Sequence, residues 1–133
     1  MLTYLDSSLA LRSILDVPER DRVIDWIDRA QSDGLISSQL LRIEVVRVLR
    51  RDGRPLSDAA ALFGKVRLVR LTQQVIVSAE AIESHIRTLD ALHLATALEI
   101  GEPVLIASHD NNMLSVARKL GFETVDPVAV SAG

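Results

Sequence analysis

Residues 1–16, MLTYLDSSLALRSILD, place one acid between two short elements. Leu2, Tyr4 and Leu5 are typical of a short buried strand, and Ser7 or Ser8 can cap a helix that follows. Asp6 stands between the two elements. Burying a carboxylate at the end of a core strand costs free energy unless it meets a cation or a substrate. We therefore expect Asp6 to have partners from elsewhere in the chain.

The rest of the chain alternates short extended apolar stretches with longer helical ones, which is typical of a parallel sheet with crossover helices. We expect strands at Leu2–Leu5, Leu35–Ser37, Leu68–Leu71, Val104–Ala107 and Glu123–Val125. We expect helices at Ser8–Leu15, Glu19–Gln31, Gln39–Arg51, Ser57–Lys65, Gln73–Glu83, Leu89–Ile100 and Asn111–Leu120. Val75–Val77 has strand propensity, but apolar residues at helical spacing and a possible N-cap at Thr72 favour a helix there.

The composition fits one globular domain. The 133 residues are 48% apolar and 25% charged, which suffices for a core and a charged surface. We expect the domain to span residues 1–130, with residues 131–133 as a short tail. The absence of cysteine excludes disulfides, thiolate metal sites and a cysteine nucleophile. No apolar run approaches the roughly 18 residues of a membrane span, and the N-terminus does not resemble a signal peptide, so we expect a cytoplasmic protein.

The charge balance is compatible with a nucleic-acid partner under one condition. A net charge of −3 is unusual for a nucleic-acid-binding protein. If several of the 18 acids surround metal ions, however, the 15 basic residues can still form a rim that faces phosphate. One tryptophan, one tyrosine and two phenylalanines are too few for base stacking to dominate recognition. Contacts to nucleic acid would therefore be largely to the backbone.

Four acids lie outside the solvated helix faces that explain most of the others. They are Asp6, Glu44, Asp90 and Asp110. Each has an ordinary structural explanation by itself: Asp90 and Asp110 could cap helices, and Glu44 could form a structural salt bridge. The case for a functional site rests on the four acids together.

Topology would bring these four acids to one edge. In an open parallel sheet, ligands bind at the carboxyl ends of strands where the strand order reverses. Asp6 and Asp110 follow the first and fourth expected strands and would face each other if those strands are neighbours. Helices beginning near that edge would add Asp90 and Glu44. Four clustered carboxylates repel by several kcal/mol unless cations hold them, and oxygen-only ligands suit Mg²⁺ or Mn²⁺.

Four motifs in order support the same site: YLDSS, SSQLLRIEVVRVLRR, LDALHLATAL and LIASHDNNML. Together they resemble PIN-domain ribonucleases, specifically the VapC-type toxins of bacterial toxin–antitoxin pairs, and the resemblance spans nearly the whole chain. It implies an α/β fold, a single PIN-like domain with a five-stranded parallel sheet flanked by helices on both faces. It also implies RNA cleavage with Mg²⁺ or Mn²⁺, held by Asp6, Asp90 and Asp110, with Glu44 as a direct ligand or a holder of metal-bound water.

The resemblance further implies a homodimer and a cognate antitoxin protein as partners, with RNA as the substrate. Two positions depart from the common family pattern. Ser108 stands where threonine is frequent and keeps the hydroxyl. Asn111 and Asn112 replace residues that are often basic, so the substrate preference of relatives is not carried over to this chain.

Three further residues have two readings each. His93 follows Asp90 by three residues and could orient that carboxylate or be a buried packing histidine. Arg47 and Arg51 follow Glu44 by three and seven residues, so they could meet RNA phosphate or pair with acids.

Two other functions compete with the nuclease. A receiver-type phosphoacceptor domain also has acids at strand ends, but it requires a lysine after a late strand, whereas Lys65 and Lys119 fall in expected helices. A non-catalytic PIN-like module could bind RNA or protein, although the retention of all four acids argues against it. Metal-dependent RNA cleavage that is lost on mutating Asp6 would separate these cases.

Overall fold

The computed structural model describes residues 1–129, so the expected tail at 131–133 and the domain boundary at 130 lie outside the described residues. A parallel sheet forms the centre of the molecule, with strand order β3-β2-β1-β4-β5. Its strands are β1 (Leu2–Leu5), β2 (Leu35–Ser38), β3 (Arg67–Val69), β4 (Val104–Ala107) and β5 (Glu123–Val125). The expected five-stranded parallel sheet is confirmed.

Helices fill the connections between the strands. They are α1 (Ser7–Leu11), α2 (Arg20–Ala30), α3 (Gln39–Arg51), α4 (Ala60–Phe63), α5 (Gln73–Glu80), α6 (Thr88–Leu98) and α7 (Asn111–Lys119). Two 3₁₀ turns, η1 (Gln31–Asp33) and η2 (Leu56–Ala59), precede β2 and α4. Within residues 1–129, no helix is long and apolar enough to cross a membrane.

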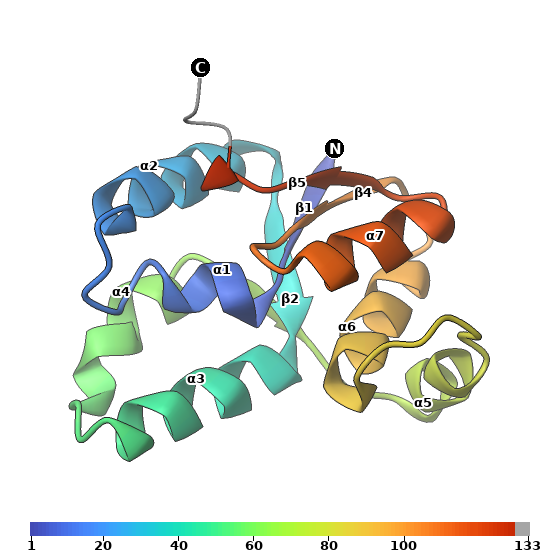
Figure 1. Ribbon diagram of the computed structural model, residues 1–133, viewed down its shortest axis with the longest axis horizontal. Coiled ribbons are helices and arrows are strands. Elements are labelled where there is room, and N and C mark those ends of the chain that lie inside the picture. The colour runs from blue at the N-terminus through green and yellow to red at the C-terminus, as the bar shows by residue number, and fades with distance from the viewer. Residues whose placement is uncertain (130–133) are drawn as a thin grey trace.

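The helices cover both faces of the sheet, because successive strand residues point to opposite sides. Leu5 of β1 packs with apolar residues of α1, α2, α3 and η2–α4 in one buried cluster. Its neighbour Tyr4 packs with α6 and α7 in a second cluster on the other face. Figure 1 shows α1 to α4 on one side of the strands and α6 and α7 on the other. The predicted two-sided α/β architecture is therefore confirmed.

Several element boundaries differ from the expected ones. α1 ends at Leu11 rather than Leu15, and the expected helix Ser57–Lys65 divides into the 3₁₀ turn η2 and the short α4. Ser7 and Ser8 do not cap α1, because Asp6 occupies the N-cap position and makes no side-chain cap bond there. Thr72 does cap α5 by accepting the Val75 N–H at 3.2 Å, which confirms that Val75–Val77 is helical.

The strand order places a switch point beside β1. β1 pairs with β2 on one side and with β4 on the other, so the chain changes direction across the sheet between β1 and β4. Such a reversal forms a crevice at the carboxyl ends of the two strands, where Asp6 and Ser108 follow Leu5 and Ala107. A receiver domain has the order 2-1-3-4-5 instead. The receiver alternative therefore does not match this fold.

Candidate active site

Asp6 is held rigidly at the carboxyl end of β1. Its backbone N–H donates to the Ala107 carbonyl at 2.9 Å, which continues the pairing of β1 with β4. The residue is buried, and its Oδ2 accepts hydroxyl hydrogen bonds from Ser8 and Ser108, each at 2.7 Å. These two hydroxyls fix the orientation of the carboxylate at the switch point.

Asp110 combines helix capping with an ion pair. As the N-cap of α7, its Oδ1 accepts the backbone N–H groups of Asn112 at 2.9 Å and Met113 at 3.1 Å. Its Oδ2 accepts a hydrogen bond from Arg87 Nη2 at 2.9 Å. The predicted capping role is confirmed. The second oxygen of the same carboxylate remains available to pair with the guanidinium of Arg87.

Asp90 lies in the first turn of α6 with its side chain only 9% exposed. It is not the helix cap, because Arg87 occupies the N-cap position. Burial raises the pKa of Asp90, its hydrogen bond with Arg87 opposes the rise, and the negative charges of Asp6 and Asp110 add to it. The pKa of Asp90 ends above its ordinary value, as expected for carboxylates that share one crevice.

Arg87 joins two of these acids through one guanidinium. Its Nε donates to Asp90 Oδ2 and its Nη2 to Asp110 Oδ2, both at 2.9 Å, although 75% of the side chain is exposed. No role was predicted for Arg87 from the sequence. The available signal was its position three residues before Asp90, which lets the two side chains meet. Among residues 1–129, no three acidic or histidine side chains form a group ready to hold a metal ion, and the arginine is the cation at this edge.

Glu44 lies on α3 and is held by a separate network. Its Oε1 accepts from the Ser7 hydroxyl at 2.7 Å and lies 2.6 Å from His93 Nε2. Burial alone would raise the pKa of Glu44, but the His93 hydrogen bond and charge, the Ser7 hydroxyl and the charge of Arg87 lower it below its ordinary value. Glu44 is therefore ionised at neutral pH and can only accept, so His93 Nε2 carries a proton.

His93 orients Glu44 rather than Asp90. The imidazole is fully buried, and its Nδ1 lies 2.7 Å from the Tyr4 hydroxyl, whose pKa is raised by burial. The histidine is thus both a packed core residue and a link from β1 to α3. Helical spacing alone suggested Asp90 as its partner, but Glu44 and Tyr4 approach the ring from other elements.

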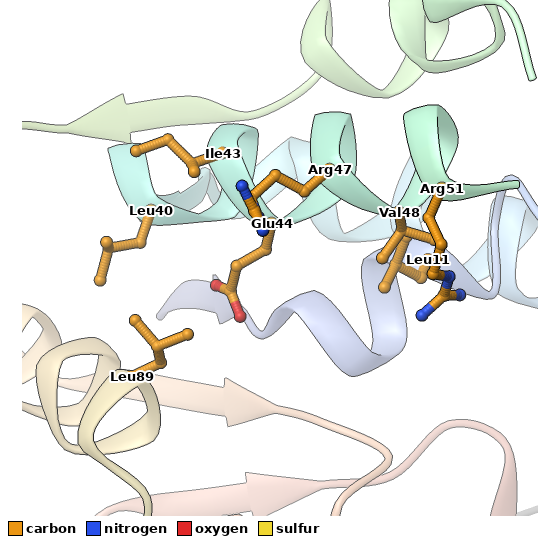
Figure 2. Close-up of a pocket in the computed structure, with 8 residues that line it drawn as sticks. All are labelled: Leu11, Leu40, Ile43, Glu44, Arg47, Val48, Arg51 and Leu89. Carbon is orange, nitrogen blue, oxygen red and sulfur yellow. The ribbon is translucent and has the colours of Figure 1, made fainter. Parts of the chain in front are cut away.

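A cavity of about 440 Å³ adjoins this network. Figure 2 shows that Glu44 points toward Leu89 at one end, whereas Val48 and Arg51 lie at the other. The lining residues are Leu11, Leu40, Ile43, Glu44, Arg47, Val48, Arg51 and Leu89. Arg51 pairs with Asp52 at 2.9 Å, and Arg47 is exposed beside Glu44, so the cavity has an aliphatic floor with cationic groups at its rim.

Comparisons with known proteins agree with this geometry. The family model described as PIN domain matches residues 3–119. This chain belongs to the PIN-domain family. Ribonuclease VapC47 of Mycobacterium tuberculosis is 33% identical, with 97% of this PIN domain and 99% of that protein covered. Ribonuclease VapC46 of the same species is 30% identical, with 93% and 96% covered. The VapC-type resemblance predicted from the four motifs is confirmed.

A solved structure supports the fold independently. FitAcB from Neisseria gonorrhoeae aligns with a TM-score of 0.65 at 17% identity, covering 95% of this PIN domain and 98% of that chain. At this level of identity the likeness concerns the fold alone. The fold of the PIN domain is thus shared with a protein whose structure has been solved.

The structure places Asp6 and Asp110 close enough to Asp90 for their negative charges to raise the pKa of Asp90. Arg87 bridges Asp90 and Asp110. Glu44 is held beside them by His93 and Ser7, and the charge of Arg87 reaches it.

Proposed function

We propose that this PIN domain is a divalent-metal-dependent endoribonuclease and the toxin of a type II toxin–antitoxin pair. The observation that supports the proposal is that the charges of Asp6 and Asp110 reach Asp90 near the switch point, where Arg87 bridges Asp90 and Asp110. Like charges placed together in a partly buried site repel one another, and a bound cation relieves the repulsion. The names of the curated relatives, both ribonucleases, supply the reaction class.

The donor set suits a hard divalent ion. Asp6, Asp90 and Asp110 would hold it through carboxylate oxygens, and Glu44 would hold it directly or through water. Such oxygen ligands favour Mg²⁺ or Mn²⁺ over softer metals. When bound, the ion would activate water and stabilise charge on the phosphoryl group.

The protein's own residues orient this chemistry. Ser8 and Ser108 hold the Asp6 carboxylate through one oxygen. His93 and Ser7 hold Glu44, whose lowered pKa keeps it charged at neutral pH. Prior orientation of these groups removes part of the entropic cost of assembling the site for reaction.

RNA would bind mainly through its backbone. Arg47 and Arg51 line the cavity beside Glu44 (Figure 2), and arginine matches phosphate in charge and geometry. The aliphatic floor of that cavity offers no aromatic ring for base stacking. This arrangement supports contact with phosphates rather than selective reading of bases.

Two protein partners complete the proposal. A cognate antitoxin would cover the acidic crevice, with an arginine of the partner taking the place of metal on the carboxylates. A second copy of this chain would bury apolar surface on α5 and α6, where Ile76, Val77 and Leu98 are 37%, 48% and 38% exposed. Co-expression with the adjacent open reading frame tests the first partner: the neighbour should bind this chain, relieve growth arrest and protect RNA.

The decisive experiment compares Asp6→Asn with Asp25→Asn. Asp25 is an exposed acid on α2, so its variant controls for the loss of one negative charge. With Mg²⁺ or Mn²⁺, we expect the wild type and the Asp25 variant to cleave RNA, EDTA to stop cleavage, and the Asp6 variant to be at least ~100-fold slower because a metal-binding charge is lost. Equal cleavage by a folded Asp6 variant would remove that residue from the site. RNA binding without cleavage by the wild type would instead favour the non-catalytic binding module.

A further inference from the structure

Arg87 lies where a metal ion would have to bind. It is the N-cap residue of α6, and its guanidinium reaches the crevice from a side chain that is 75% exposed. Nε and Nη2 contact different carboxylates, so a single cation ties the first turn of α6 to the N-terminus of α7. A long, exposed side chain can exchange such partners readily, because the pair gains little from burial.

Arg87 and a divalent ion would compete for the same carboxylate oxygens of Asp90 and Asp110. Oδ1 of Asp110 already accepts two backbone N–H groups at the start of α7. Oδ2 is therefore the oxygen that Asp110 can turn toward a metal ion, and this same atom accepts from Arg87. Asp90 also meets Arg87 through its Oδ2. A divalent ion at these oxygens would displace the guanidinium.

A displaced Arg87 would remain at the mouth of the crevice. Its backbone is anchored at the start of α6, three residues from Asp90, so the guanidinium cannot move far from the site. The anion that arrives next in an RNA-cleaving site is a phosphate of the substrate. Guanidinium forms paired hydrogen bonds with phosphate as it does with carboxylate.

We propose that Arg87 is a substrate-phosphate ligand of this site, stored on Asp90 and Asp110 until a divalent ion takes those carboxylates. The role of Arg87 in binding phosphate rests on the proposed ribonuclease function. Its pairing with Asp90 and Asp110 before metal binds concerns only the free protein and the metal ion. Arg87 thereby offsets part of the negative charge of these carboxylates before metal binds and contacts RNA afterwards.

The first test measures Mn²⁺ affinity by calorimetry without RNA. Arg87→Ala should bind Mn²⁺ ~3- to 10-fold more tightly than the wild type, because the competing cation is gone. Arg29→Ala is the matched control, since Arg29 is exposed at the end of α2, just before the amino end of β2 and thus at the opposite edge of the sheet. The control should stay within about twofold of the wild type. Unchanged or weaker Mn²⁺ binding by a folded Arg87→Ala variant overturns the storage role.

The second test measures RNA cleavage at Mn²⁺ concentrations that saturate each variant. Arg87→Ala should lower kcat/KM by ~10- to 100-fold, and Arg87→Lys should recover part of the loss because it keeps the charge without the planar fork. Cleavage by Arg87→Ala that equals the wild type overturns the phosphate role. A wild type that cleaves no RNA overturns both that role and the proposed function, whereas the calorimetry still decides whether Arg87 competes with metal.

Discussion

At the scale of single residues, the acids of this site differ in how their charges are balanced. Asp6 is held by two neutral hydroxyl groups, Asp90 by an exposed guanidinium, and Glu44 by a buried imidazole. The pKa of Asp90 is raised whereas that of Glu44 is lowered. The metal-free protein therefore bears an electrostatic cost at Asp90 that it does not bear at Glu44.

Replacing Asp90 by asparagine should stabilise the metal-free protein at neutral pH. A raised folded-state pKa adds stability below the unfolded value of about 3.9, and this stability is lost as pH rises through the folded pKa. The wild type loses that contribution and Asp90→Asn does not, so unfolding in EDTA should show that the variant is the more stable protein at pH 7. The difference should shrink as the pH falls toward 4 and vanish below about pH 3, where Asp90 is protonated in both the folded and the unfolded state. A variant that is less stable at pH 7 would show that the Arg87 pair outweighs the burial cost.

The positions of the acids were easier to predict from the sequence than the partners of His93 and Arg87. The placement of Asp6 and Asp110 at one edge was predictable, because Asp6 directly follows β1, Asp110 comes three residues after β4, and the carboxyl ends of parallel strands meet at one edge. The pairing of His93 with Glu44 was not, because the two residues lie 49 positions apart on helices whose relative orientation depends on packing. Local spacing pointed to Asp90, the nearer acid. Arg87 was missed because an exposed arginine before a helix usually has a solvated role.

At the scale of elements, α7 begins directly at the crevice. Its N-cap, Asp110, uses one oxygen for the helix and the other for a cation. Expected helix ends were otherwise less accurate than expected strands, since α1 and α5 stop earlier than their apolar patterns do. Those patterns continue into turns whose apolar side chains still pack on the core, as Ile14 and Ile82 do.

Two substitutions at Asp110 should separate the capping role from the charge. Asparagine caps helices as well as aspartate does, so Asp110→Asn should keep the free energy of unfolding within about 0.5 kcal/mol while weakening Mn²⁺ binding at least ~10-fold. Asp110→Ala should weaken metal binding similarly and also cost about 0.5–2 kcal/mol of stability. Urea unfolding in EDTA and calorimetry with Mn²⁺ measure the two effects. Equal stability of the two variants would show that the cap contributes nothing.

At the scale of the whole molecule, the α/β architecture with helices on both faces of the sheet was predictable from the alternation of short and long apolar stretches. Strand order was not fixed by that alternation, since it depends on which crossovers return across β1. The sequence also did not predict which apolar side chains would remain exposed on the surface. The structure locates exposed apolar side chains on α5 and α6, beside a cavity of about 460 Å³ that Ile76, Ile82 and Ile86 help to line.

We expect a homodimer whose interface includes α5. Val77→Asp should shift the protein toward monomer at micromolar concentration, because a charge would have to be buried against the partner. Leu56→Asp is the control: Leu56 is 40% exposed on η2, which belongs to the opposite helical layer. Light scattering measures both variants against the wild type. A wild type that is monomeric, or a Val77 variant that stays dimeric, contradicts this interface.

The central position of β1 affects when the acidic site can assemble during synthesis of the chain. The bond between Asp6 and Ser108 spans 102 residues, so Asp6 gains this partner only after β4 has been synthesised. Contacts between such distant segments form late, because the intervening chain must be ordered first. A nascent chain therefore carries Asp6 long before it carries Asp90 and Asp110. If the domain cleaves RNA, its acidic site cannot assemble before Asp90 and Asp110 have been synthesised.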